Sequence, residues 1–206
     1  MALDFANTDI VSGGDRSTDV LRSVEEFLAW CRYAGVAAAS SVHVGTSANE
    51  EQSLLRTATH VRAAIRIAMV TVARHLDIDP TVLHTLRSAY ADAIGQATPG
   101  LDGDHLSWAW EPGSPRAALS ELVASAVDLL RDHPAGRLKE CPSCGFVFLD
   151  ATRNGSRRWC SMEDCGTEEK MRRYVAKRAE ARARPTSTPR GPGLLNARPE
   201  HRTPER

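Results

Sequence analysis

Four cysteines near the C-terminal end constrain this chain more than any other feature. They form two pairs, Cys141-Pro142-Ser143-Cys144 and Cys160-Ser161-Met162-Glu163-Asp164-Cys165, with fifteen residues between the pairs. Two residues between ligands is the spacing that lets one tight turn supply two thiolates to a tetrahedral zinc ion. Gly145 permits the left-handed backbone that such a turn needs. We therefore expect Cys141, Cys144, Cys160 and Cys165 to hold one zinc ion, which is structural because no coordination position remains for a water molecule.

Two other interpretations of the cluster remain open: four reduced cysteines without a ligand, or a redox-active pair. The N-terminus has no basic segment and carries Asp4 and Asp9, so we expect no secretory signal and a cytoplasmic location. Metal binding is favoured over disulfides in that compartment. No apolar stretch is long enough to span a membrane, so no membrane partner is expected. The fifth cysteine, Cys31, falls on an apolar helix face and is predicted to be a buried, inert thiol.

The first 135 residues are predicted to be mainly helical. Helix starts are expected at Ser23, Ser47, Asp79-Pro80 and Ser114-Pro115, where capping residues or an initial proline precede apolar residues at helical spacing. The second helix has the strongest pattern, with an apolar face that includes Leu54, Ala58, Val61, Ile65, Ala68, Val72 and Leu76. Its arginines, Arg56, Arg62, Arg66 and Arg74, are expected largely off that face. In the third helix the inward side chains are predicted to be Leu83, Leu86, Tyr90 and Ile94.

Two segments are predicted to be extended. Residues His105–Trp110 alternate in polarity, and Phe146–Leu149 forms a short apolar run that we expect to pair with a return through Arg157–Trp159. The predicted fold class is therefore α+β: a mostly helical domain over 1–135 with a small strand component, and a treble-clef-like zinc finger over 136–184. The last segment, 185–206, is rich in proline and predicted to be a disordered tail.

Charge divides the chain in the same place. Residues 1–136 contain 10 basic and 17 acidic side chains, whereas residues 137–206 contain 16 basic and 9 acidic ones. An acidic body with a basic end is typical of proteins that contact nucleic acid. The candidate nucleic-acid-binding residues are Arg153, Arg157, Arg158, Lys170, Arg172, Arg173, Lys177 and Arg178. On a helix after Cys165, Lys170, Arg173, Lys177 and Arg184 would lie within about 60° of one another. The alternative is that the basic surface binds the acidic body or a protein partner, and nearby glutamates weaken its field.

Catalytic signatures are missing from the sequence. It has no phosphate-binding or dinucleotide-binding glycine motif, no nucleophile elbow and no His-Glu-x-x-His helix, so we expect no enzyme activity. Trp108 and Trp110, at strand spacing, are candidates for the floor of a pocket for a small-molecule effector. Core packing is the alternative role for these two tryptophans.

The finger resembles a known family. The segments Leu138–Gly145, Phe148-Leu149-Asp150, Arg153-Asn154 and Ser156–Met162 are similar to the CGNR zinc finger, found at the C-terminus of bacterial proteins described as stress-induced transcription regulators. The opening Ala2-Leu3-Asp4-Phe5-Ala6-Asn7-Thr8 resembles the start of their N-terminal ABATE domain. The resemblance implies a zinc-holding finger that binds DNA through its many basic residues. Our own hypothesis is that the N-terminal domain senses a signal or dimerises.

The sequence departs from the family pattern at its name-giving motif. Cys-Gly-Asn-Arg is replaced here by Cys165-Gly166-Thr167-Glu168, so an arginine position holds a carboxylate. The expected function is a DNA-binding transcription regulator, with a homodimer and a small-molecule effector as further candidate partners. The alternative is a zinc-stabilised module that binds a protein and does not contact DNA directly.

Overall fold

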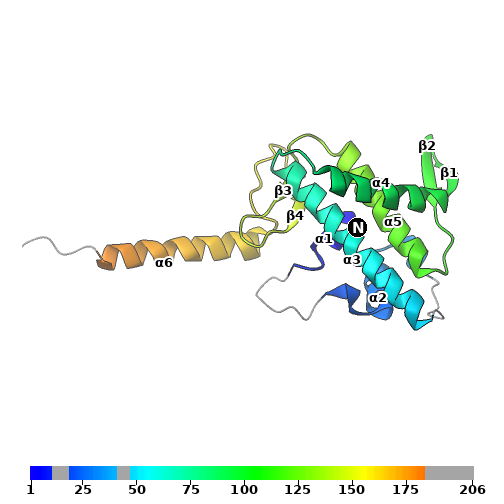
Figure 1. The fold of residues 1–206 in the computed structure, drawn as a ribbon. Helices are drawn as coiled ribbons and strands as arrows, with labels where there is room; N and C mark the ends of the chain where they lie inside the picture. The colour runs from blue at the N-terminus through cyan, green and yellow to red at the C-terminus, as the bar shows by residue number, and fades with distance from the viewer. Residues whose placement is uncertain (11–18, 41–46, 184–206) are drawn as a thin grey trace, which may run out of the picture. The chain divides into compact units, whose positions relative to one another are not determined.

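A computed structural model describes residues 1–10, 19–40 and 47–183. The predicted disordered tail over 185–206 lies outside these residues. The chain divides into two compact units, Met1–Glu169 and Lys170 to the C-terminus. The α+β class is confirmed, because helices dominate and two small antiparallel sheets accompany them (Figure 1). Within the described ranges, no helix is long and apolar enough to cross a membrane.

The first unit is built around one long helix, α3 (Ala48–Ala73), against which α1 (Ala2–Asn7), α2 (Val24–Tyr33), α4 (Pro80–Gly95) and α5 (Pro115–Asp132) pack (Figure 1). Two short 3-10 turns, Val20–Arg22 and Ala37–Ala39, complete the body. Its core contains Phe5, Phe27, Ile65, Met69 and Leu122, all fully buried. Each of these five α-helices contributes an apolar face to one shared core, as amphipathic helices must when they fold together.

The predicted helix starts are confirmed. Ser47 forms a reciprocal capping box with Glu50, and the Ser23 hydroxyl accepts a hydrogen bond from the Glu26 N–H at 3.1 Å. Asp79 and Ser114 cap helices whose first residue is proline. These local signals act within one turn, so they do not depend on the rest of the fold.

Three predictions about helix faces are wrong. Leu76 is 62% exposed because α3 ends at Ala73 and His75 adopts a positive φ of 57°. Leu83, in the first turn of α4, is 49% exposed. Arg62 is buried, since α1 and the segment near Asp19 cover its side of α3; its guanidinium donates to Asp19 at 2.6 Å.

The first sheet is a hairpin of β1 (Thr98–Asp102) and β2 (His105–Ala109), with Leu101 opposite Leu106. Only β2 was predicted, because Pro99 and Gly100 in β1 are residue types that usually indicate a turn and not a strand. The second sheet pairs β3 (Leu138–Glu140) with β4 (Val147–Leu149).

The prediction that the apolar run Phe146–Leu149 pairs with Arg157–Trp159 is therefore wrong. The partner strand precedes Cys141 instead, and the first cysteine pair forms the connection between β3 and β4.

Candidate metal centre

The first cysteine pair lies in the tight connection between β3 and β4. The Gly145 N–H donates to the Cys141 carbonyl at 2.8 Å, and the Cys141 N–H donates to the Phe146 carbonyl at 2.8 Å. Gly145 has a φ of +78°, a conformation that favours glycine, as its position after the pair predicts. The two strands therefore fix the backbone on both sides of Cys141 and Cys144.

The second pair is ordered by a helical turn. Ser161 caps the turn Met162–Gly166, and its hydroxyl accepts from the Asp164 N–H at 3.1 Å. The turn carries Cys165 and leads directly into α6 (Thr167–Ala183). A Cβ at Gly166 would lie 3.3 Å from the methyl group of Met162, an exposed and flexible side chain that can move aside.

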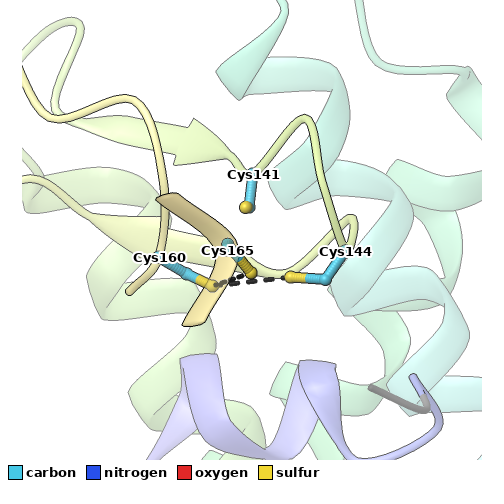
Figure 2. A group of neighbouring side chains, drawn as sticks. All are labelled: Cys141, Cys144, Cys160 and Cys165. Atoms are coloured by element: carbon cyan, nitrogen blue, oxygen red, sulfur yellow. Dashed lines mark hydrogen bonds between the residues drawn. The ribbon is translucent and has the colours of Figure 1, made fainter. Parts of the chain in front are cut away.

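The four sulfur atoms converge on one point (Figure 2). All lie within 4.8 Å of one another; Cys144 and Cys160 sulfurs are 3.4 Å apart, and Cys160 and Cys165 sulfurs 3.6 Å apart. A tetrahedral zinc ion with Zn–S bonds of about 2.3 Å requires sulfur separations of about 3.8 Å. The residues therefore fit one zinc ion.

The thiols differ in how readily they ionise. Burial opposes ionisation of Cys141, but N–H groups of Cys144, Cys160 and Ser143 hydrogen-bond to its sulfur and lower its pKa to about 7. Burial, together with the neighbouring thiols, raises the pKa of Cys165 to about 11 and that of Cys160 further. Four thiolates in so small a volume need a cation to balance their charge, which is what a zinc ion provides.

A buried carboxylate organises the loop between the two pairs. Asp150 accepts from the Lys139 ammonium at 2.7 Å, from the Thr152 N–H at 2.9 Å and from the Arg157 N–H at 2.9 Å. The Lys139 and Thr152 contacts hold the pKa of Asp150 well below its usual range. The loop over 150–157 is thereby closed onto β3, which positions the residues just before Cys160.

The three candidate arginines of this loop have different environments. Arg157 donates to the Trp159 and Cys160 carbonyls, and its guanidinium lies 5.2 Å from the Phe148 ring centroid. Its side chain is therefore used within the finger. Arg153 and Arg158 are exposed, and the Arg158 guanidinium lies 5.1 Å from the Trp159 ring centroid.

Side chains from the helical body hold the hairpin in place, and sequence reasoning missed them. The Asn7 amide donates to the Val147 carbonyl at 2.8 Å and accepts from the Val147 N–H at 2.9 Å. Arg66 donates to the Gly145 carbonyl at 2.9 Å, and Arg74 forms an ion pair with Glu140 at 2.7 Å. The only signal in the sequence was the family-like opening that contains Asn7.

The remaining candidate basic residues lie on α6. Lys170, Arg172, Arg173, Lys177 and Arg178 are all exposed. The Arg178 guanidinium donates to the Tyr174 hydroxyl at 3.1 Å. Arg184 lies outside the described residues.

The other residues singled out in the sequence lie in the body. Trp108 and Trp110 are half-buried, and the Trp110 indole N–H donates to the Ala93 carbonyl at 2.8 Å, which ties the hairpin to α4. Their role in a small-molecule pocket stays a prediction. Cys31 is fully buried, and burial raises its pKa to about 12, as expected for an inert thiol.

The fold and the site together define a zinc-finger protein, in which a four-cysteine finger is joined to a helical body. A family model described as "CGNR zinc finger" matches residues 137–178. A second family model, ABATE, described as "Putative stress-induced transcription regulator", matches residues 1–133. The chain belongs to the ABATE family. The predicted cofactor, one structural zinc ion, is confirmed by the finger match and the converging thiols. No curated protein matches the chain.

Proposed function

We propose that this protein is a cytoplasmic transcription regulator that binds DNA through its finger and α6, and that it acts by binding and not by catalysis. One observation carries the proposal. At 100° per residue, the face of α6 from Lys177 through Tyr174 to Arg182 spans about 140°. The described residues on it include four cations and no acid: Lys170, Lys177, Arg178 and Arg182. We call it the Tyr174 face.

The acids of α6 lie elsewhere on the helix. Glu168, Glu169 and Glu180 fall outside the Tyr174 face, and Glu169 and Glu180 lie within about 40° of Arg173 around the helix axis. Glu169 and Glu180 therefore dilute the positive field beside Arg173, whereas Glu168 lies about 40° beyond Arg182, just outside the other edge of the Tyr174 face. A one-sided cationic surface attracts the phosphates of DNA and releases their counterions on binding.

We also propose that the body senses an effector or mediates dimerisation; the family description supports the coarser role of a stress-induced transcription regulator. A protein-binding module is the second candidate function. The exposure of Met171 (57%) and Val175 (61%) favours it, because apolar side chains on a helix surface can dock on a protein.

Salt-dependent binding separates the two candidates. We expect Lys170, Lys177, Arg182, Arg153 and Arg158 to contact phosphates, which implies a log–log salt slope of about −4 to −5 for a random-sequence duplex. Fluorescence anisotropy between low and physiological salt measures this slope. Each alanine substitution at these five positions should reduce the slope by about one.

The matched control is Arg172→Ala, which removes one charge on the opposite side of α6 and should leave the slope unchanged. Zinc content must stay at one ion per chain in every variant, so that a lost contact is not confused with a lost fold. No binding at low salt, or an equal effect of Arg172→Ala, would contradict the DNA-binding proposal.

A further inference from the structure

Two side chains in contact, Tyr174 and Arg178, occupy the middle of the Tyr174 face. Tyr174 and Arg178 are one helical turn apart; the guanidinium lies 5.5 Å from the Tyr174 ring centroid and donates to its hydroxyl at 3.1 Å. Two contacts therefore hold an arginine that is otherwise exposed to solvent. Arginine side chains on exposed helices usually lose much conformational entropy on binding, and this arginine is partly ordered in advance.

The chemistry of an ordered arginine in this position matches one base in particular. A guanidinium has five N–H donors, and two of them match the O6 and N7 acceptors of guanine in the major groove. Met171 and Val175 lie beside Arg178 on the same side of α6 and are exposed. Apolar side chains of this kind contact the methyl group of thymine, which is also in the major groove.

Cations lie on both sides of Tyr174, Arg178 and Met171, whereas Val175 lies about 20° beyond Arg182. Lys170 and Lys177 lie on one edge of the Tyr174 face and Arg182 on the other, about 120–140° apart around the helix axis. The major groove is about 12 Å wide, admits an α-helix, and has a phosphate strand on each side. A helix face without acids, with Arg178 near its centre and cations at both edges, fits that groove.

We propose that α6 enters the major groove of DNA and that Arg178, positioned by Tyr174, recognises a guanine. This inference rests on the proposed function, because it names the groove and the base that the DNA-binding surface reads. An anionic membrane is a poorer fit, since amphipathic membrane helices have a wide apolar face, and among the described residues of α6 the exposed large apolar side chains are Met171, Tyr174 and Val175.

The experiment starts with the full-length, zinc-loaded protein and a pool of duplexes with a random 20-base-pair core. Selected duplexes should share a guanine, and replacing it by 7-deazaguanine, which lacks N7, should weaken wild-type binding. Arg178→Ala should lower affinity for the selected duplex by about 5- to 150-fold. Its affinity for the unselected pool should fall much less, and it should no longer distinguish 7-deazaguanine from guanine.

Tyr174→Phe tests the positioning role, because it keeps the ring and removes the hydroxyl that accepts from Arg178. We expect about a 2- to 10-fold loss for the selected duplex and little change for the pool. Arg172→Ala, on the opposite side of α6, is the control and should keep the guanine preference.

The outcomes separate the inference from the proposed function. Should Arg178→Ala weaken the selected duplex and the pool equally, with a salt slope smaller by one, Arg178 contacts phosphate and the inference fails while DNA binding stands. Wild-type indifference to 7-deazaguanine at every selected guanine would also overturn it. Absence of any wild-type binding to the pool at low salt would overturn both.

Discussion

Replacing Asn7 by alanine tests whether the zinc finger and the helical body fold as one unit. The Asn7 amide donates to the Val147 carbonyl at 2.8 Å and accepts from the Val147 N–H at 2.9 Å. Val147 lies on β4, directly beside the first cysteine pair, and is buried. Alanine would leave both backbone groups of Val147 without these partners.

The expected loss of folding free energy follows from those two hydrogen bonds. A hydrogen bond contributes about 0.5–1.5 kcal/mol to stability, and a buried group left without a partner costs about 1–3 kcal/mol. We expect Asn7→Ala to lower the free energy of unfolding by about 2–4 kcal/mol. For a domain of this size, 1 kcal/mol shifts Tm by about 2–4 °C, so Tm should fall by about 5–15 °C.

Circular dichroism would follow the melting of the helices, and a chromophoric chelator would follow zinc release in the same temperature range. In Asn7→Ala, the midpoint temperatures of helix melting and of zinc release should fall together. The matched control is Asn49→Ala, an exposed asparagine at the start of α3, which should shift stability by less than about 0.5 kcal/mol. A change in Asn7→Ala as small as that in the control, or zinc release that does not move, would refute the coupling.

Three further predictions follow from the same geometry. Cys160→Ser should reduce bound zinc well below one ion per chain and lower Tm, because metal binding contributes to folding; an unchanged zinc content by metal analysis would contradict this. The hydrogen bond from Arg62 lowers the pKa of Asp19 in the folded protein. The pair therefore stabilises the fold at pH values above the usual aspartate pKa, and this stabilisation is lost as pH falls through the lowered pKa. In denaturant unfolding, Asp19→Asn should be destabilising at pH 6 and progressively less so as pH falls below the usual aspartate pKa, and an equal effect across that range would be evidence against the ion pair. Thr167→Asn with Glu168→Arg should raise affinity for DNA about fivefold at low salt, because a carboxylate is replaced by a cation, and unchanged binding would mean that this position lies off the DNA path.

The local features of the fold could be predicted from sequence because their causes lie within one turn or one loop. Ser47 caps α3 through its own neighbours, and Gly145 follows the cysteine pair at the point where the backbone needs a positive φ. The metal site could be predicted for the same reason, since the backbone next to each pair of cysteines orders that pair.

The features that could not be predicted depend on residues far apart in the chain. Asn7 and Val147 are separated by 140 positions, and neither residue type indicates the other. Helical periodicity predicts that Arg62 is exposed to solvent. Its side chain is buried instead, which its ion pair with Asp19 allows. The strand before Cys141 was missed because three residues of mixed polarity, Leu138–Glu140, carry no strand pattern of their own.

Titrating zinc into the metal-free protein, with a fluorescent duplex present, tests most directly that the four-cysteine centre supports DNA binding. Cys141, Cys144, Cys160 and Cys165 form one site for one ion. The anisotropy of the duplex should therefore rise with added zinc and level off at one equivalent per chain. Full binding by the metal-free protein, or a plateau at another stoichiometry, would contradict a zinc centre that organises the DNA-binding region.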